Sequence, residues 1–369
     1  MTKADLTYSP EEVSPPGETL RDLMEERSLS QAELSRRLGR PPQAINEIIA
    51  GKKEITEETA LELERVLQVP AHFWLAREAR YREYLARLRD VERRKDHIQW
   101  LDAFPIKALQ ALGKLTPGRL TPARKSQLVD EMLRFFGVAS PDGWRAQYTS
   151  VQAAFRRARP AKQTDNAAIT AWLRMGEIAA EKVTTNAYSA EALTAALPSM
   201  RALTVCAADK IGSDLLWLTA QAGVVLVFVP SLPGAHVSGV ARWLNDRPLI
   251  QLSLLGNWND IFWFNFFHEV AHILKHPKRA VFLDDAASGA AVESPEEQEA
   301  NQFAADVLVP MAQRAALDVL PLDRAHVEAF AKRLGIHPGI VVGQLQHCGR
   351  IGYGHALTLL KARYELNAP

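Results

Sequence analysis

One short segment in the second half of the chain constrains the fold and the chemistry most strongly. It runs from His268 through Glu269 to His272. Two histidines four residues apart lie on the same face of an α-helix, one turn apart, so both imidazoles can bind one metal ion. The glutamate beside the first histidine can act as general base toward a water molecule. The segment therefore predicts a helix that carries a catalytic zinc site, with His268 and His272 as ligands and Glu269 as base.

The residues around this segment predict its structural context. Ile261–Phe267 is rich in aromatic side chains and Pro277 stops the pattern, so we expect a buried helix from about 259 to 275. A second helix is expected from Pro295 to about Leu308, after a loop at 280–294.

This second helix is expected to supply a carboxylate as third ligand, which leaves one coordination position open. Glutamate-type zincins place the ligand three residues before a small residue and four before Asp or Asn, and Glu297 fits because Ala300 and Asn301 follow it. Asn301 then shares a helix face with Glu297 and can orient a ligating histidine. Glu299 is the alternative third ligand. His276 is not expected as a ligand, because an ideal helix would rotate it away from the face that His268 and His272 share.

Strands are expected only before this helix. Val224–Val229 is a β-branched run typical of a buried strand, and Val237–Leu244 and Pro248–Leu254 flank a turn and predict a hairpin. If Ser238–Leu244 is an edge strand, a peptide substrate could pair with it across the metal. His236, Arg242 and Tyr353 are candidates for the group that stabilises the oxyanion.

The metal-site residues, together with the segment Glu297–Ala305 and the Val307-Leu-Val-Pro310 run, resemble the ImmA/IrrE family of metallopeptidases. The resemblance covers roughly residues 200–310. It implies a gluzincin-like protease that cleaves a regulatory protein, such as a repressor. It also implies zinc held by His268, His272 and Glu297, with Glu269 as general base.

A different signal lies near the start of the chain. Ser30, with Glu33 three residues later, predicts a helix start, and Gly39 predicts its end. A third short helix follows at 41–50, as in a helix-turn-helix. Its core is expected from Ala32, Leu34, Leu38, Ile45 and Ile48.

Polar and basic side chains of this region are candidates for DNA contact. Gln31 can reach a phosphate from the first turn of its helix, and Gln43 and Asn46 suit adenine edges. Arginines and lysines gather despite an otherwise acidic domain. The basic candidates are Arg36, Arg37, Arg40, Lys52 and Lys53.

The stretch from Pro15-Pro16-Gly17 to Phe73-Trp74-Leu75 resembles HigA-type antitoxins of the XRE repressor class. The resemblance covers about residues 15–85 and implies operator DNA as a partner. Pro42 is a departure, because it offers no donor near a base-reading position. Since such domains bind operators as dimers, we expect a homodimer.

The fold class expected is mainly α with a small α+β zincin-like core. It comprises an all-α helix-turn-helix domain, a helical connector and a gluzincin-like metallopeptidase domain. The predicted segments are a flexible tail (1–14), the helix-turn-helix domain (15–85), a helical connector (86–198), the zinc metallopeptidase core (199–310) and a C-terminal helical subdomain (311–369).

Composition limits the remaining classes. The chain has two cysteines, Cys206 and Cys348, far apart, which argues against a disulfide framework and fits a cytoplasmic protein. No apolar run is long enough to span a membrane. A net charge of +1 confines any DNA binding to a local patch.

Together these features predict a DNA-binding transcriptional regulator with a zinc-dependent endopeptidase domain. The endopeptidase is expected to cleave a regulatory protein, either a repressor or a toxin–antitoxin component. The alternative is a non-enzymatic HigA-like antitoxin or repressor, in which the zincin domain is a sensor or a protein-binding scaffold.

Overall fold

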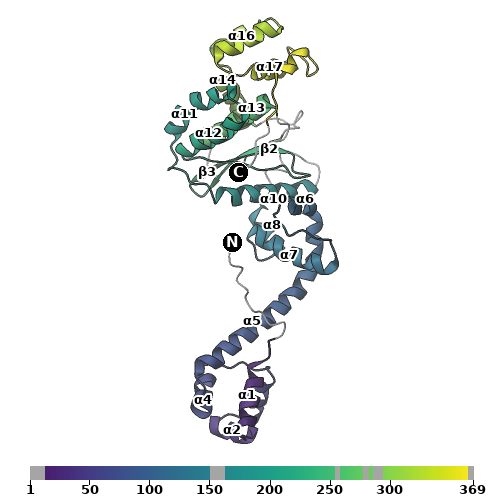
Figure 1. Ribbon diagram of the computed structural model, residues 1–369, viewed down its shortest axis with the longest axis vertical. Helices are drawn as coiled ribbons and strands as arrows, with labels where there is room; N and C mark the ends of the chain where they lie inside the picture. Colours follow the sequence, from purple (N-terminus) through teal and green to yellow (C-terminus); the bar gives the residue numbers. More distant parts are fainter. Residues whose placement is uncertain (1–12, 150–162, 254–257, 277–281, 286–293, 365–369) are drawn as a thin grey trace. The chain divides into compact units, whose positions relative to one another are not determined.

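The computed structural model describes residues 13–149, 163–253, 258–276, 282–285 and 294–364 (Figure 1). It is mainly helical with one four-stranded sheet, which confirms the predicted fold class. Two compact units divide the chain, residues 1–97 and 98–369. The finer segment boundaries stay predictions, and most of the expected tail (1–14) falls outside the described residues. No described helix is long and apolar enough to cross a membrane.

The first unit is a bundle of short helices followed by one long helix. The helices are α1 (Pro16–Glu26), α2 (Gln31–Leu38), α3 (Pro42–Ile49), α4 (Glu57–Leu67) and α5 (Ala71–Asp96). The Ser30 hydroxyl accepts a hydrogen bond from the Glu33 amide at 3.2 Å, so it caps α2. Gly39 ends α2 in the left-handed region, with φ at 64°. Both ends of α2 therefore lie where the local residues predict them.

The core of this unit forms between α1, α2, α3, α4 and the start of α5. Leu34, Leu38, Ile45 and Ile48 are buried in it, as expected. Ala32 is exposed, so its predicted place in the core is wrong. It immediately follows the first residue of α2, and the helix turns this position toward solvent while Leu34 and Leu38 face inward.

The second unit is built around the sheet. Its strands are β1 (Val225–Phe228), β2 (Val237–Leu244), β3 (Arg247–Leu252) and β4 (Phe282–Asp285), in the spatial order β1-β3-β2-β4. β1 runs parallel to β3, whereas β2 is antiparallel to both β3 and β4. The hairpin β2–β3 turns at Asn245, whose φ is 58°. This is the predicted hairpin.

Two expectations about strands are wrong. Residues 282–285 of the predicted loop form β4, which pairs with β2 from Val237 to Ala241. β2 is consequently an inner strand along this stretch and not an edge. The local sequence could not reveal this, because β4 is four residues long and its pairing partner lies some forty residues away.

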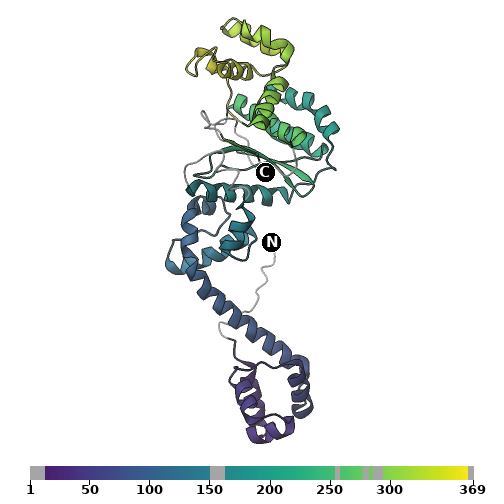
Figure 2. The same cartoon turned by 180° about the vertical axis from the view of Figure 1, so that it is seen from behind.

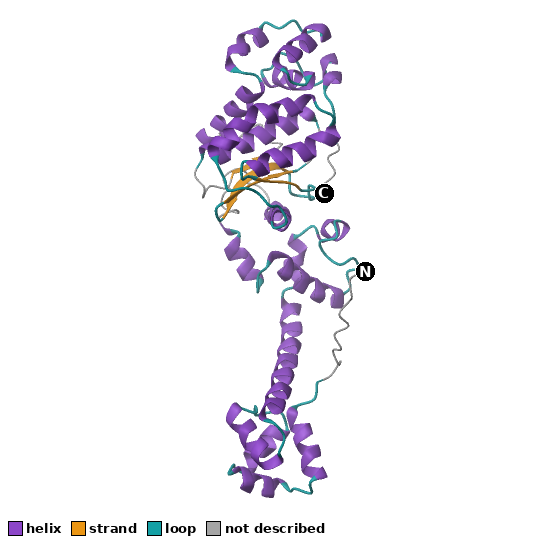
Figure 3. Cartoon of the chain, turned by 60° about the vertical axis from the view of Figure 1, so that its left-hand side comes forward, coloured by secondary structure: helices purple, strands orange, loops and turns teal. Residues whose placement is uncertain are grey.

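Helices cover both faces of the sheet (Figures 2 and 3). One face packs against α10 (Gln163–Ala180) and the helices that precede it, and the other packs against α13 (Asn259–Lys275), α14 (Pro295–Leu308) and their neighbours. Alternate residues of β1 point into the two cores, Val225 and Val227 on one side and Leu226 and Phe228 on the other. β1, β2 and β3 are therefore largely buried on both faces.

The remaining helical elements belong to the same unit. They are η1 (Ile98–Ala103), α6 (Ile106–Ala111), α7 (Pro122–Phe136), α8 (Pro141–Gln147), α11 (Ala190–Ala202), η2 (Leu203–Val205), α12 (Ala208–Gln221), η3 (Met311–Gln313), α15 (Arg314–Asp318), α16 (Arg324–Leu334), α17 (Pro338–His347) and η4 (Ala356–Leu360).

Candidate functional site

The helix α13 presents the predicted metal-binding residues at a buried position. It packs its aromatic side chains against β2, β3, α14 and α17. His268 and His272 are 1% and 3% exposed, and Glu269 is fully buried. Charged and polar groups at such depth require specific partners, because their desolvation is costly.

Three of the predicted residues come together between α13 and α14. His268 Nε2 lies 2.9 Å from His272 Nε2 and 3.1 Å from Glu297 Oε2, and His272 Nε2 lies 3.6 Å from Glu297 Oε1. Zinc bonds of about 2.0–2.1 Å in tetrahedral geometry give an edge of about 3.3 Å between two ligand atoms. The three separations bracket that edge, so the residues present fit a zinc ion.

The hydrogen bonds behind the two histidines orient their rings. Asn301 Oδ1 lies 2.9 Å from His268 Nδ1. An amide oxygen only accepts, so His268 Nδ1 donates and the lone pair of the neutral ring is on Nε2. The equivalent Nδ1 of His272 lies 2.8 Å from His276 Nδ1. Both ligand nitrogens therefore face Glu297, as second-sphere contacts of metal-binding histidines usually require.

The ionisation of these groups suits metal binding. Burial lowers the pKa of His272 to about 4, although the Glu297 carboxylate opposes the shift. Burial acts to raise the pKa of Glu297, but the two imidazoles that face the carboxylate, those of His268 and His272, outweigh it and lower the pKa to about 2. A neutral imidazole and an ionised carboxylate are the forms that coordinate a cation.

The two alternatives for the third ligand have other contacts. Glu299 forms an ion pair with Lys275 at 2.7 Å and lies 3.4 Å from His276 Nε2. His276 follows the last residue of α13 and has an extended backbone, with φ −109° and ψ 157°. His276 is not among the three residues whose ligand atoms cluster. It contacts His272 from behind.

Glu269 lies against a glycine of the sheet that sequence reasoning missed. A Cβ atom placed on Gly239 of β2 would come 2.5 Å from Glu269 Oε1 and 3.0 Å from its Cγ. Only glycine leaves room for this carboxylate between α13 and β2. The only signal in the sequence was a lone glycine inside a strand pattern, which often marks such a close approach.

The candidates for oxyanion stabilisation are dispersed. Arg242 binds Glu177 of α10 at 2.7 Å and donates to the Leu173 carbonyl, so it is committed to packing α10 on the sheet. That face is opposite α13, and its geometry argues against Arg242. His236 is exposed. Tyr353 is 79% exposed and lines a pocket.

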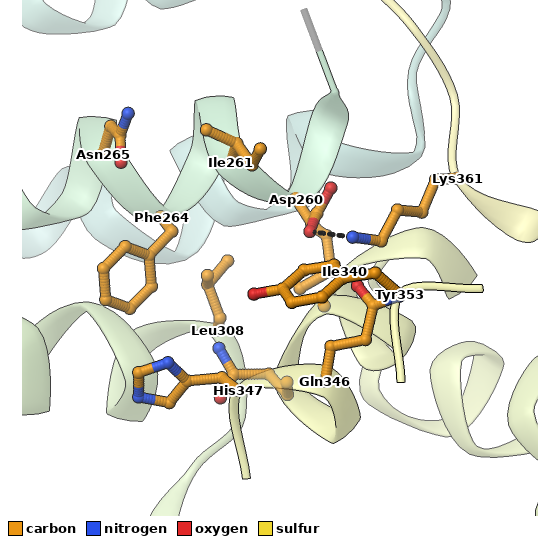
Figure 4. Close-up of a pocket in the computed structure, with 12 residues that line it drawn as sticks. Asp260, Ile261, Phe264, Asn265, Leu308, Ile340, Gln346, His347, Tyr353 and Lys361 are labelled. Carbon is orange, nitrogen blue, oxygen red and sulfur yellow. Dashed lines mark hydrogen bonds and ion pairs between the residues drawn. The ribbon is translucent and has the colours of Figure 1, made fainter. Parts of the chain in front are cut away.

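This pocket has a volume of about 180 Å³ and is lined mainly by residues of α13 and α17 (Figure 4). Its wall on α13 includes Phe264, whose ring centroid lies 6.3 Å from that of His268, one helical turn later. Tyr353 and His347 face Phe264 across the opening, and a Lys361–Asp260 ion pair of 2.5 Å closes the other end. A partly apolar recess thus lies one helical turn from His268, and none of the three clustered residues lines it.

The predicted DNA contacts are mostly exposed on α2, α3 and the segment after α3. Exposed members are Gln31, Arg36, Arg37, Gln43, Asn46, Lys52 and Lys53. Arg36 and Arg37 both bond Glu33, and the Gln43 amide donates to Glu47. Arg40 differs, because it binds Glu62 of α4 at 2.5 Å and its side chain is 21% exposed. It is therefore less available to DNA than the others.

Comparisons with known proteins divide the chain in the same way. Residues 20–74 match the family model described as helix-turn-helix, and residues 234–343 match the model described as IrrE N-terminal-like domain. No curated protein matches the chain. The second match contains α13, α14 and hence the three clustered residues.

Two similar solved structures each cover 22% of the chain. The antitoxin HigA of Pseudomonas aeruginosa, solved with the higBA promoter, is 26% identical over 22% of this chain and 90% of that chain, with a TM-score of 0.22. A protein assigned as the antidote of a plasmid maintenance system in Nostoc punctiforme is also 26% identical, over 22% of this chain and 88% of that chain, with a TM-score of 0.21. From the two family matches, the chain joins a helix-turn-helix domain of the DNA-binding type to an IrrE N-terminal-like domain of a metallopeptidase family.

Proposed function

We propose that this chain is a transcriptional regulator that binds operator DNA through its first unit and cleaves a regulatory protein with a zinc-dependent endopeptidase in its second unit. The substrate class is a repressor or a component of a toxin–antitoxin pair. The observation that carries the peptidase proposal is the convergence of His268, His272 and Glu297, whose ligand atoms all lie within 4.8 Å of one another.

His268, His272 and Glu297 would hold the zinc ion through Nε2, Nε2 and the carboxylate. Zinc, when bound, supplies a Lewis acid that polarises a carbonyl and acidifies water. Glu269 accepts a proton from the attacking water and returns it to the nitrogen of the leaving amine. Asn301 and His276 keep the imidazoles oriented for this arrangement.

The sheet order supports a position for the proposed substrate. Among the described strands β4 lies at one edge of the sheet, and its Asp284 pairs with Gly239, the residue that contacts Glu269. An extended peptide that pairs with the free edge of β4 would therefore run past the position of Glu269, the proposed base. The sequence alone suggested pairing of the peptide with β2 instead. The recess beside Phe264 would receive a side chain of the same peptide.

Two variants separate catalysis from the non-enzymatic alternative. His268→Ala should lose zinc, measured by metal analysis of the purified protein. Glu269→Gln should retain zinc and operator binding but accumulate the uncleaved regulatory protein in cells, detected by quantitative proteomics. A Glu269→Gln strain with the same proteome and phenotype as wild type would favour the sensor or scaffold reading.

A further inference from the structure

The recess beside Phe264 has both apolar and polar walls (Figure 4). Its volume is about 180 Å³, whereas sites for drug-sized ligands measure about 300–1,000 Å³. Phe264, Leu308 and Ile340 supply apolar surface, and Asp260 and Gln346 supply a carboxylate and an amide. The recess therefore suits a small group that combines an apolar body with a polar end.

Much of this lining lies beyond the part of the chain that matches the IrrE N-terminal-like domain. That match ends at residue 343. The lining residues that follow it are Gln346, His347, Tyr353 and Lys361. The chemistry of the recess consequently does not follow from the family match.

Two oxygen atoms of the lining residues are buried acceptors that lack a donor. Gln346 is 7% exposed, and its Nε2 donates to Thr358 Oγ1 at 3.1 Å, but its Oε1 has no hydrogen-bond partner among the described residues. Asp260 Oδ2 accepts from Lys361 at 2.5 Å, whereas Asp260 Oδ1 has no partner in the described part of the chain. An unpaired buried acceptor is destabilising, and a group that donates to it removes that cost.

Donors belong to the same lining. The Lys361 ammonium has three N–H groups and gives one to Asp260, and Tyr353 contributes a hydroxyl at the opening. The charges of Lys361 and Asp260 cancel, so this pair attracts neither an anion nor a cation by net charge. A primary amide offers two N–H donors and one carbonyl acceptor without any charge. It complements the acceptors and the donors of the recess together.

We propose that the recess binds a primary amide attached to a small apolar body. The amide N–H groups donate to Gln346 Oε1 and Asp260 Oδ1, its carbonyl accepts from Lys361, and its apolar body packs against Phe264. The Tyr353 side chain at the opening is 79% exposed, so few contacts oppose a turn that admits the amide.

Two sources have this chemistry. One is the side chain of an asparagine or glutamine in the substrate protein, and the other is a free small amide. For the first source the inference rests on the proposed peptidase function, whereas the binding of an amide as such does not.

Ligand-observed NMR titration of the full chain with benzamide tests the chemistry. Acetophenone is the matched probe, because it keeps the ring and the carbonyl and replaces only the amide nitrogen by a methyl group. Benzamide should bind wild type about ten-fold more tightly than acetophenone, as expected for a hydrogen bond to a buried acceptor. Equal affinities, or no saturable binding of benzamide, overturn the proposal.

Gln346→Met tests the location. Methionine keeps an unbranched side chain and removes the acceptor, so the affinity for benzamide should fall about ten-fold while that for acetophenone stays the same. Gln302→Met, the same exchange on α14 outside the recess, is the matched control and should change neither affinity. Circular dichroism checks the fold, and the ratio of the two probes on wild type decides even if Gln346→Met does not fold. A folded Gln346→Met protein that binds benzamide as tightly as wild type overturns the proposal.

Substitutions in the substrate separate the two sources. Each asparagine or glutamine near the cleavage site of the identified substrate is replaced by leucine, and KM is measured with wild type and with Gln346→Met. Loss of a side chain held in the recess should raise KM about ten-fold with wild type but not with Gln346→Met. If benzamide binds wild type as expected and no replacement changes KM, the source is a free small amide. Benzamide binding needs no turnover, so its failure is distinguishable from a failure of the proposed peptidase function.

Discussion

Replacement of Asn301 by alanine should weaken zinc binding without removing a ligand. Asn301 Oδ1 accepts the hydrogen bond from His268 Nδ1 at 2.9 Å, and His268 is 1% exposed. A buried N–H left without an acceptor costs about 1–3 kcal/mol. Part of that cost is also present in the metal-free protein, and only the remainder lowers the affinity for zinc. The expected loss of zinc affinity is therefore about 10- to 100-fold, which is typical when a hydrogen-bond partner of a metal ligand is removed.

The assay compares the unfolding free energy with and without excess zinc. At a zinc concentration of about 1,000 times the dissociation constant, binding stabilises the wild type by about 4 kcal/mol. A 30-fold weaker variant at the same concentration should retain about 2 kcal/mol of that stabilisation. Gln302→Ala, which removes the neighbouring amide that bonds Asp306, serves as control. If Asn301→Ala gains as much stability from zinc as wild type, the assigned role of Asn301 is refuted.

Three further substitutions test other parts of the structure. Gly239→Ala should lower the turnover of the identified substrate by roughly 100-fold with zinc retained, because its Cβ would lie 2.5 Å from Glu269 Oε1. Gly352→Ala is the control and should leave turnover unchanged, because its added Cβ has no atom within 4 Å. Equal turnover in both variants would argue against the role of Gly239. Lys52→Ala and Lys53→Ala should each reduce the slope of log affinity against log salt concentration by about 0.9 in operator-binding assays. Arg40→Ala should reduce this slope less, because Arg40 binds Glu62. Equal slopes for the three variants would contradict this difference. Gly176→Ala should destabilise the second unit by about 1–3 kcal/mol in denaturant unfolding, because the added Cβ would overlap Gln251 Oε1 at 1.9 Å. An unchanged midpoint of the denaturant unfolding transition would contradict the close packing of α10 on β3.

Local signals were sufficient to predict the helices that carry the sites. Ser30 and Gly39 limit α2 through contacts within a few residues, and α14 runs from Pro295 to Leu308, the range expected from its proline and apolar pattern. Helix caps and the i, i+4 relation of His268 and His272 depend only on near neighbours. This is why the sequence by itself determined which helices form and which side chains share a face on each.

Contacts between distant segments were decided only by the tertiary structure. The pairing of β4 with β2, the room that Gly239 leaves for Glu269, and the bond between Arg40 and Glu62 each join residues far apart in the chain. Sheet order and close approach of backbones depend on how whole elements pack, and no local pattern of residues encodes that packing.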